Sequence, residues 1–457
     1  MTTGSTYDAL PYTSLPYPRT HPDHLFAMAR LFGVRAAPVE TCRVLEIGCG
    51  SAGNLLAMAE SLPRGRLVGV DPSGGEIERG RAVASQLGLD NLRLVAGTAD
   101  DVEGTFDYVI AHGVLSWVAP ELRRAILARG RALLADDGVF YASYNVFPGW
   151  HLRGAVRGML RHHVTAREPA AQIASARTLI DWLSRRLTRD GGALRAVLDE
   201  EIARLASADD AYLFHELLEE DNHPLWFADF VAEAAEAGLS WLGEADPAAN
   251  VSRMAAPRAY DSLRDIAGDD PIRVEQHFDF LRSRTFRASL LVKQPHVRRE
   301  APGEAWSDLF VASRGPGDAY IEDENLAAAL ARLAAEWPDA LPIAELSIDS
   351  EGESAGVLAA RRPIEPEQLV PLHTASIVEL RARRLELARA PLEMPWASPL
   401  ARLQARGSGM VTNLRHEPLP LSPEERAALV ELDGTRSADG PAAIRLAELA
   451  LLRRRAP

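Results

Sequence analysis

The sequence has little of several features that mark particular classes of protein. Its 457 residues contain only two cysteines, Cys42 and Cys49, which flank one predicted strand and would lie about 23 Å apart at the usual rise per residue. They cannot form a disulfide with each other, and such sparse cysteine favours a reduced, cytoplasmic setting. Because the sequence has neither a charged-then-apolar leader nor an apolar run that could cross a bilayer, we expect no membrane insertion.

Positive charge and metal-ligand patterns are also scarce. The formal net charge is -14, whereas binding along a nucleic-acid backbone requires clustered positive charge. We therefore expect no nucleic-acid partner. His215 and His223 flank an acidic run at 216–221, but their spacing fits no standard metal site. This run is either a solvated helix face or a surface for a cationic peptide.

The most informative stretch is 43–53. Its apolar start is typical of a buried parallel strand, and glycines at 48, 50 and 53 then turn the chain into a helix. The positive end of that helix suits a ligand with hydroxyls and a carboxylate. A second apolar run at 66–70 ends at Asp71, and an acid there can accept both hydroxyl protons of a ribose. The two runs together predict a nucleoside site.

Two cofactors fit this pattern. The glycine spacing satisfies the G-x-G-x-x-G fingerprint of dinucleotide enzymes, so a nicotinamide enzyme is a rival. A glycine turn without any ligand is a third alternative. Glu46 lies inside the strand, where a carboxylate cannot help to bind pyrophosphate but can order the loop or meet a cation. Glu46, the glycine turn and Asp71 together resemble the class I S-adenosylmethionine (SAM) methyltransferases.

The rest of the chain indicates an α/β core with additions. Strands expected at 92–95, 106–111 and 139–143 each end in polar or aromatic residues, at the edge where open α/β sheets bind ligands. A helix at 225–237 and strands at 239–245 and 286–292 would finish a methyltransferase sheet with an antiparallel pair. We divide the chain into an N-terminal arm and SAM-binding core (1–151), a helical insertion that is a lid or a dimerisation layer (152–220), a regulatory-domain-like segment that completes the sheet (221–295), and a separate C-terminal domain of mixed α/β structure (296–457).

Several stretches, in the same order along nearly the whole chain, are similar to one family. They are Tyr7-Asp8, Pro11-Tyr12, Thr20–Pro22, His112-Gly113, Ser116-Trp117, Ser143–Asn145, Pro148–His151, His215–Leu217, Asn222, Pro224, Asp279–Arg284, Phe286-Arg287, Leu290-Leu291, Pro399–Arg402, Thr412–His416 and Leu432–Arg436. Together they resemble bacterial methyltransferases with a methyltransferase regulatory domain, a group that includes lysine methyltransferases of outer-membrane proteins. The resemblance implies a Rossmann-like seven-stranded α/β sheet and SAM as cofactor, and it makes the nicotinamide alternative unlikely.

The expected cofactor contacts come from the N-terminal arm and the ends of the first four strands. They are Tyr7, Glu46, Gly48, Cys49, Gly50, Asn54, Asp71, Pro72, His112 and, near the adenine, Thr98, Ala99 and Asp100. The first 24 residues are rich in tyrosine and proline. They are either a loose terminus or an arm folded over the cofactor. We expect Asp23 to cap the helix that follows, which ends near Gly33.

The expected catalytic residues are Tyr12, His112, Trp117, Tyr144, Asn145 and Trp150. Methyl transfer is an in-line displacement in which the leaving thioether is neutral, so alignment matters and no acid is needed. His112 is a general base or a structural hydrogen-bonding residue. The Tyr144 hydroxyl could orient the nucleophile, and the Asn145 amide could face an amino group or serve the turn. Trp117 and Trp150 hold a cation on their faces or belong to the core.

Three hypotheses follow for function. The first is SAM-dependent methylation of an amine, in particular of lysine in a protein or peptide. The second is O- or N-methylation of a small molecule. The third is a regulatory protein that binds SAM without turnover. The partner is a methyl acceptor in the first two cases, and a homodimer through 152–220 is the alternative to a lid.

Overall fold

The computed structural model describes residues 14–186, 193–250, 257–293, 306–347, 364–391, 393–407, 409–435, 437 and 440–454. Its centre is a seven-stranded sheet in the order β3-β2-β1-β4-β5-β7-β6. The first five of these strands are parallel, whereas β7 is antiparallel to both of its neighbours, which confirms the predicted fold. The strands are β1 (Arg43–Ile47), β2 (Arg66–Asp71), β3 (Leu92–Ala96), β4 (Phe106–Ala111), β5 (Leu134–Asn145), β6 (Ser240–Glu244) and β7 (Phe286–Val292).

Helices cover both faces of the sheet because the side chains of each central strand alternate between two hydrophobic clusters. Val44 packs in one cluster with residues of α2 (Pro22–Leu31), α3 (Gly53–Ser61) and α4 (Gly74–Leu87). Its neighbour Leu45 packs in the other, with residues of α5 (Pro120–Leu133) and α10 (Phe227–Glu236). All six residues of β4 are buried, as expected of a central parallel strand.

Two local predictions need correction. We expect Asp23 to cap the first helix, but the N-cap is His21, whose Nδ1 accepts from the Asp23 amide at 3.1 Å. The Asp23 carboxylate instead contacts Arg381, far along the chain. Strand β5 is also longer than 139–143, since its pairing with β4 begins at Leu134 and resumes at Val139 after an irregularity in register.

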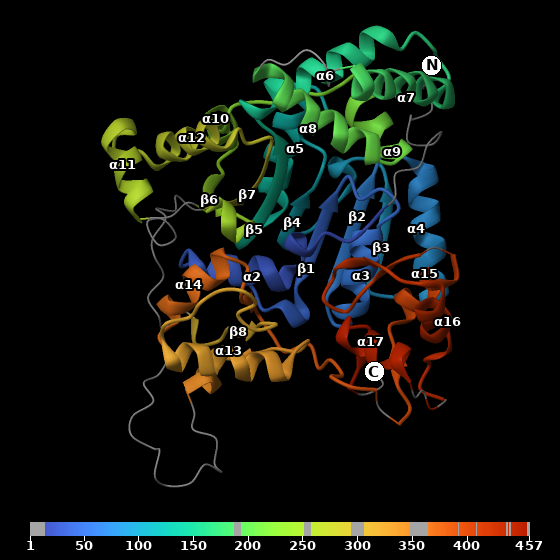
Figure 1. Cartoon of the computed structure of the whole chain (residues 1–457), viewed down its shortest axis with the longest axis vertical. Coiled ribbons are helices and arrows are strands. Elements are labelled where there is room, and N and C mark those ends of the chain that lie inside the picture. Colours follow the sequence, from blue (N-terminus) through green and yellow to red (C-terminus); the bar gives the residue numbers. More distant parts are fainter. Residues whose placement is uncertain are drawn as a thin grey trace.

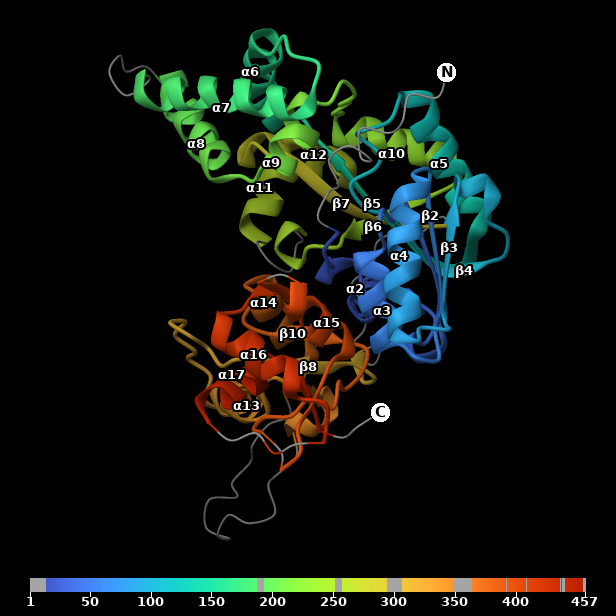
Figure 2. The ribbon, with the colours of Figure 1, turned by 90° about the vertical axis from the view of Figure 1, so that its right-hand side faces the viewer.

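A helical layer follows β5, as predicted for 152–220. It contains α6 (Gly149–His163), α7 (Pro169–Arg186), α8 (Ala193–Ser207), the short α9 (Asp210–Tyr212) and one π-helical segment (Leu213–Leu218). The layer has a hydrophobic cluster of its own. Helix α6 follows the carboxyl end of β5. Figures 1 and 2 show the helical layer at this edge of the sheet, beyond the carboxyl ends of the parallel strands. Whether it serves as a lid or as a dimer interface stays a prediction.

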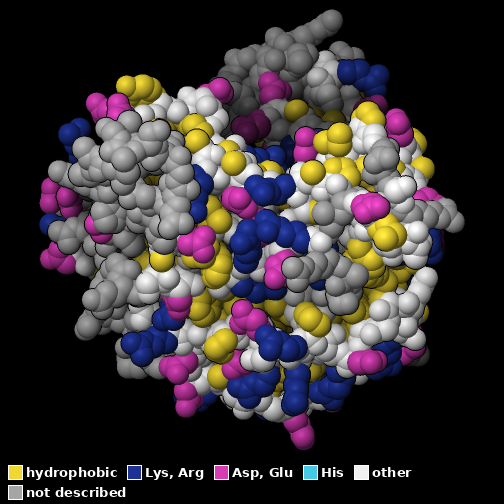
Figure 3. Space-filling model, turned by 90° about the horizontal axis from the view of Figure 1, so that it is seen from below, with side chains coloured by type: hydrophobic (Ala, Val, Ile, Leu, Met, Phe, Trp, Pro, Cys, Tyr) yellow, Lys and Arg dark blue, Asp and Glu magenta, His cyan; other side chains and the backbone are white. Residues whose placement is uncertain are grey.

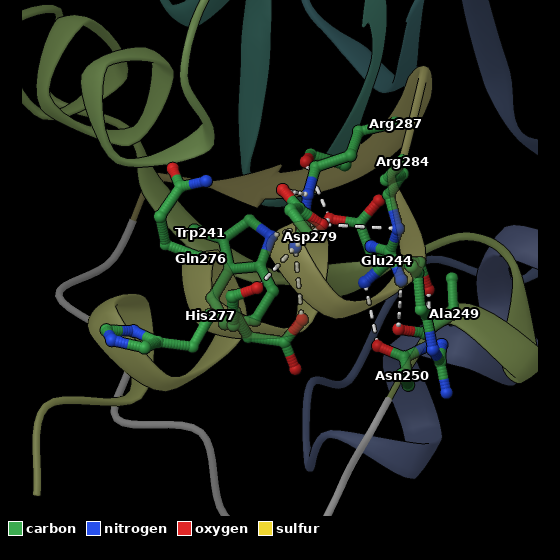
Figure 4. A network of polar contacts seen from close by, with 12 residues as sticks. Trp241, Glu244, Ala249, Asn250, Gln276, His277, Asp279, Arg284 and Arg287 are labelled. Atoms are coloured by element: carbon green, nitrogen blue, oxygen red, sulfur yellow. Dashed lines mark hydrogen bonds and ion pairs between the residues drawn. The ribbon is translucent and has the colours of Figure 1, made fainter. Parts of the chain in front are cut away.

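The last two strands are joined to their helices by a buried ionic network (Figure 4). The Arg287 side chain is fully buried and contacts the carboxylates of Glu244 at 2.8 Å, Asp279 at 2.9 Å and Glu275 at 3.2 Å. Its guanidinium also lies 3.7 Å from the centre of the Phe227 ring. A buried carboxylate is costly without a partner. Arg287 therefore ties β6, β7, α10 and α12 (Pro271–Arg282) into one unit. The neighbouring helix α11 spans Pro257–Ala267.

The C-terminal domain lies at the opposite end of the molecule from the helical layer (Figures 1 and 2). Three small sheets pair β8 (Phe310–Ala312) with β9 (Leu341–Pro342) and β10 (Glu379–Arg381), β11 (Trp396–Ala397) with β14 (Leu452–Arg453), and β12 (Met410–Thr412) with β13 (Pro418–Pro420). Its helices are α13 (Glu324–Glu336), α14 (Pro366–Thr374), α15 (Pro399–Gly407), α16 (Pro423–Glu431) and α17 (Pro441–Glu448).

This domain packs against the helices of the sheet. Described residues between Trp306 and Leu400, such as Leu380, share one hydrophobic cluster with α2 and α3, whereas a separate cluster contains residues from Ala388 to Leu452. Figure 3 views the molecule from this end, where acidic and basic side chains are interspersed. Arg384, for example, pairs with both Glu336 and Asp339.

Among the described helices, none combines the length and the apolar character needed to cross a bilayer. The described residues also contain no group of three or more His, Cys, Asp or Glu side chains that could hold a metal ion.

Candidate functional site

The turn after β1 has one closely packed glycine and one open glycine. Gly48 and Gly50 have φ values of +74° and +52°, in the left-handed region that favours glycine. A Cβ atom on Gly48 would lie 2.4 Å from Cγ2 of Val114, whereas one on Gly50 would meet no described atom within 4 Å. The backbone at Gly50 is therefore accessible to a ligand, directly before the N-terminus of α3.

Glu46 offers a buried acceptor beside this turn. Its Oε1 accepts from Nδ2 of Asn54 at 2.8 Å, but its Oε2 has no hydrogen-bond partner among the described residues. Burial raises the pKa of Glu46 to about 8, against the opposing effect of the Asn54 bond, and the charge of Asp71 raises it further. An unsatisfied buried carboxylate oxygen is costly. A cationic amine such as that of SAM would supply the missing partner, so these residues fit that cofactor.

Asp71 lies at the end of β2, as predicted, and fixes the turn. Its two oxygens accept from the amides of Gly50 and Ser73, both at 2.9 Å. Asp71 thus stands at the edge of the sheet where we predict that the ribose of the cofactor binds. Cys49 is buried, and burial raises the pKa of its thiol well above the usual value, so it contributes a neutral surface. Pro72 is exposed.

The end of β3 forms a capped turn. The Thr98 hydroxyl accepts from the Asp100 amide at 3.3 Å, and the Asp101 carboxylate accepts from the Thr98 amide at 2.8 Å. Ala99 is buried, whereas the side chain of Asp100 is 85% exposed and lies 3.6 Å from Nε of Arg129. Thr98 and Ala99 thus shape the turn, and Asp100 keeps a carboxylate available at the edge where we expect the adenine.

His112 ends β4 in an aromatic environment. The centre of its half-buried ring lies 3.6 Å from that of Tyr17 and 6.3 Å from that of Phe286. Its Nδ1 is 3.0 Å from the Tyr141 hydroxyl and 3.3 Å from the Ser143 hydroxyl. Burial lowers the pKa of His112 to about 3, so the ring is neutral at pH 7 and far too weak a base to deprotonate an ammonium group. Of our two alternatives, the geometry favours a hydrogen-bonding role.

The described part of the N-terminal arm lies over the same place. The Ser14 hydroxyl accepts from the Gly53 amide at 2.8 Å, and the Tyr17 amide donates to Oδ1 of Asn54 at 3.0 Å. The described arm residues thus lie over the start of α3, and whether the arm covers the cofactor stays a prediction. Tyr7 and Tyr12, the arm residues that we predict for the site, lie outside the described residues.

Tyr144 points away from His112, so its position does not favour the catalytic role that we predict for its hydroxyl. Tyr141 and Ser143 both contact His112, and side chains alternate along a strand, so Tyr144 faces the other side of β5. Its hydroxyl lies 2.8 Å from that of Ser289, and its ring stacks on Phe230 with centres 3.7 Å apart. These contacts give Tyr144 a place in the core.

The other predicted catalytic residues surround the β5–α6 connection. Asn145 is buried, with Nδ2 donating to Oδ1 of Asn222 at 3.2 Å. Trp150 is buried in the first turn of α6, and its Nε1 has no hydrogen-bond partner among the described residues. Trp117 is half-buried. Among the described residues, none of these three side chains forms a hydrogen bond or a ring contact with His112, so their catalytic roles stay predictions.

Sequence reasoning missed four residues of this region. Tyr17 could have been predicted as a site residue, because it belongs to the tyrosine-rich N-terminal arm. Tyr141 and Ser143 could have been found from the alternation along β5. His416 lies in the family-like stretch Thr412–His416, but that resemblance does not indicate its place beside the site, because its Nε2 lies 2.7 Å from Oδ1 of Asn54 across 362 positions of sequence.

Comparisons with known proteins agree with this architecture. Residues 45–140 match the family model described as "Methyltransferase domain", and residues 209–293 match "Predicted methyltransferase regulatory domain". Residues 393–444 match "PKMT, C-terminal winged helix domain". The uncharacterized protein RP028 of Rickettsia prowazekii is 33% identical over 233 residues, which are 50% of this chain and 93% of that protein. The chain belongs to the SAM-dependent methyltransferases that carry a methyltransferase regulatory domain.

Two further similarities concern larger parts of the chain. The uncharacterized protein RP789 of the same organism is 35% identical over 289 residues, 62% of this chain and 52% of that protein, so the match spans about half the length of this relative. The structure of PKMT2 from Rickettsia typhi superimposes with a TM-score of 0.82 at 24% identity, covering 96% of this chain and all of the other. The latter establishes a shared fold for nearly the whole chain.

Proposed function

We propose that this methyltransferase transfers the methyl group of SAM to an amine, specifically to a lysine side chain in a protein or peptide. The observation that carries the proposal is the aromatic environment of His112, whose ring centre lies 3.6 Å from that of Tyr17 and 5.7 Å from that of Tyr141 at the carboxyl edge of the sheet. The resemblance of the chain's motifs to those of lysine methyltransferases supports the same acceptor.

An aromatic enclosure suits an amine for two reasons. An ammonium group that leaves water for a region of low polarity has a lowered pKa, so a lysine can lose its proton to solvent on entry without a strong base. The neutral amine then has the lone pair needed for attack. Aromatic faces also attract a methylated, cationic amine, by about 0.5–2 kcal/mol for each suitable ring.

SAM supplies the reactive methyl group on a sulfonium. The residues of this chain orient the cofactor and the acceptor relative to each other. In this proposal Glu46 holds the amine of the cofactor and Asp71 holds its ribose, while Tyr17 and Tyr141 fix the His112 ring through packing and hydrogen bonding. Alignment of nucleophile and methyl group at about 3–3.5 Å is the main requirement of an in-line transfer.

The test uses methyl-labelled SAM and a heat-treated bacterial lysate, in which the lysate's own methyltransferases are inactive. After incubation with the purified protein, the mixture is separated into protein and small-molecule fractions, and labelled protein is hydrolysed to amino acids. We expect label in methylated lysine. Label confined to small molecules would overturn the proposal in favour of a small-molecule acceptor. An absence of transfer to any fraction, with SAM still bound, would indicate a regulatory protein.

A further inference from the structure

The C-terminal domain contacts the cofactor helix α3 through buried polar groups. Near the end of the helix, Glu60 accepts from the Ser398 hydroxyl at 2.8 Å and from the Leu400 amide at 3.2 Å. Near its start, Asn54 accepts from Nε2 of His416 at 2.7 Å. The contact of His416 differs from that of Ser398, because Asn54 also donates to Glu46, the residue that we expect to hold the amine of the cofactor.

His416 is held in place by a tight turn between β12 and β13. The Asn413 side chain accepts from the amides of Arg415 and Glu417, both at 2.9 Å, and the Asn413 carbonyl accepts from the His416 amide at 3.1 Å. His416 has a left-handed backbone, with φ of +67°, which is uncommon for a residue with a side chain. The ring is buried and lies 4.9 Å from that of His21.

The hydrogen bonds define the orientation of the Asn54 amide. Its Oδ1 faces the backbone amide of Tyr17, at 3.0 Å, and this group can only donate. His416 must therefore also donate to Oδ1, from a protonated Nε2. The Asn54 Nδ2 group is then directed to Oε1 of Glu46, at 2.8 Å, and to the Thr20 hydroxyl, at 3.0 Å. A continuous path of two hydrogen bonds leads from His416 through Asn54 to Glu46.

This path determines which oxygen of Glu46 is available to a ligand. With Oε1 occupied by Asn54, Oε2 is left buried and without a hydrogen-bond partner among the described residues. We propose that His416 is a positioning residue for the cofactor site, which it completes from the C-terminal domain by orienting Asn54 and, through it, the Glu46 carboxylate. The inference depends on the cofactor alone and is independent of which acceptor is methylated.

The test compares the affinity for S-adenosylhomocysteine, the demethylated cofactor, among variants of the full chain. His416→Ala and His416→Gln meet the same backbone constraint, but only glutamine can place an N–H group near the position of Nε2. We expect His416→Ala to weaken binding at least about fivefold, as for the loss of a buried hydrogen bond, and His416→Gln to restore most of it. Ser398→Ala is the matched control, because it removes a bond across the same interface without touching Asn54.

Calorimetry measures the affinity and thermal unfolding measures the effect on the fold. We expect Ser398→Ala to lower the melting temperature while leaving the affinity unchanged. If His416→Ala does not fold, His416→Asn replaces it, since asparagine tolerates the left-handed backbone but its amide stops short of the Nε2 position. Wild-type affinity in the folded variant would overturn the proposal. An equal loss in Ser398→Ala would do so as well, because general loosening of the interface would then explain the effect.

Discussion

Binding of S-adenosylhomocysteine at pH 7 should release nearly one proton, and the proton should come from Glu46. Burial raises the pKa of this carboxyl group to about 8 in the cofactor-free protein, so about 90% of the molecules carry the proton at pH 7. The cationic amine of the ligand favours the ionised form and lowers this pKa. If the pKa falls well below 7 in the complex, about 0.9 protons are released for each ligand bound.

The assay is calorimetry at pH 7 in two buffers with different ionisation enthalpies, whose difference in apparent binding enthalpy gives the number of protons. The same linkage means that affinity increases with pH, by nearly tenfold per unit, until the pH reaches about 8. Glu46→Gln has no proton to release, so its proton count and this pH dependence should both vanish. No proton release by the wild-type protein, or equal release by Glu46→Gln, would refute the reasoning.

Three substitutions test other parts of the account. Asp71→Ala should weaken binding of S-adenosylhomocysteine by about 1–3 kcal/mol, because the ribose loses its acceptor and the Gly50 and Ser73 amides lose theirs; unchanged affinity in calorimetry would place the ribose elsewhere. Tyr144→Phe should reduce the free energy of unfolding by about 1 kcal/mol with turnover retained, and a large loss of turnover at unchanged stability would return Tyr144 to the site. Arg287→Met should cost about 3–5 kcal/mol in urea unfolding, because the buried carboxylates of Glu244, Asp279 and Glu275 all lose their contact with a cation that is itself fully buried; a cost below about 1 kcal/mol would show that the contacts of Arg287 are not needed for stability.

Much of the fold could be predicted because its signals are local. Buried parallel strands are short apolar runs, and glycine or polar residues punctuate them. The same logic finds Glu46, Asp71 and His112, since residues at the ends of parallel strands meet at one edge of the sheet. The direction of the Tyr144 side chain could also have been predicted, because side chains alternate along β5 and Tyr144 must face the other side of the sheet from Tyr141 and Ser143.

Other features depend on contacts between distant parts of the chain. The carboxylate of Asp23 looks like a helix cap in the sequence but accepts from Arg381, and Asn54 accepts from His416. No pattern of spacing connects these pairs, because they meet only after the C-terminal domain packs on α2 and α3. Sequence reasoning therefore predicts a cofactor turn after β1, but it misses the contacts that the C-terminal domain makes with α2 and α3.

The central claim is that the turn after β1 holds SAM, with its amine at Glu46 and its ribose at Asp71. A crystal structure with S-adenosylhomocysteine tests this directly. We predict that the amine lies within hydrogen-bonding distance of Oε2 of Glu46 and that the ribose hydroxyls donate to Asp71. An amine directed away from Glu46, or a ligand bound outside this turn, would contradict the account.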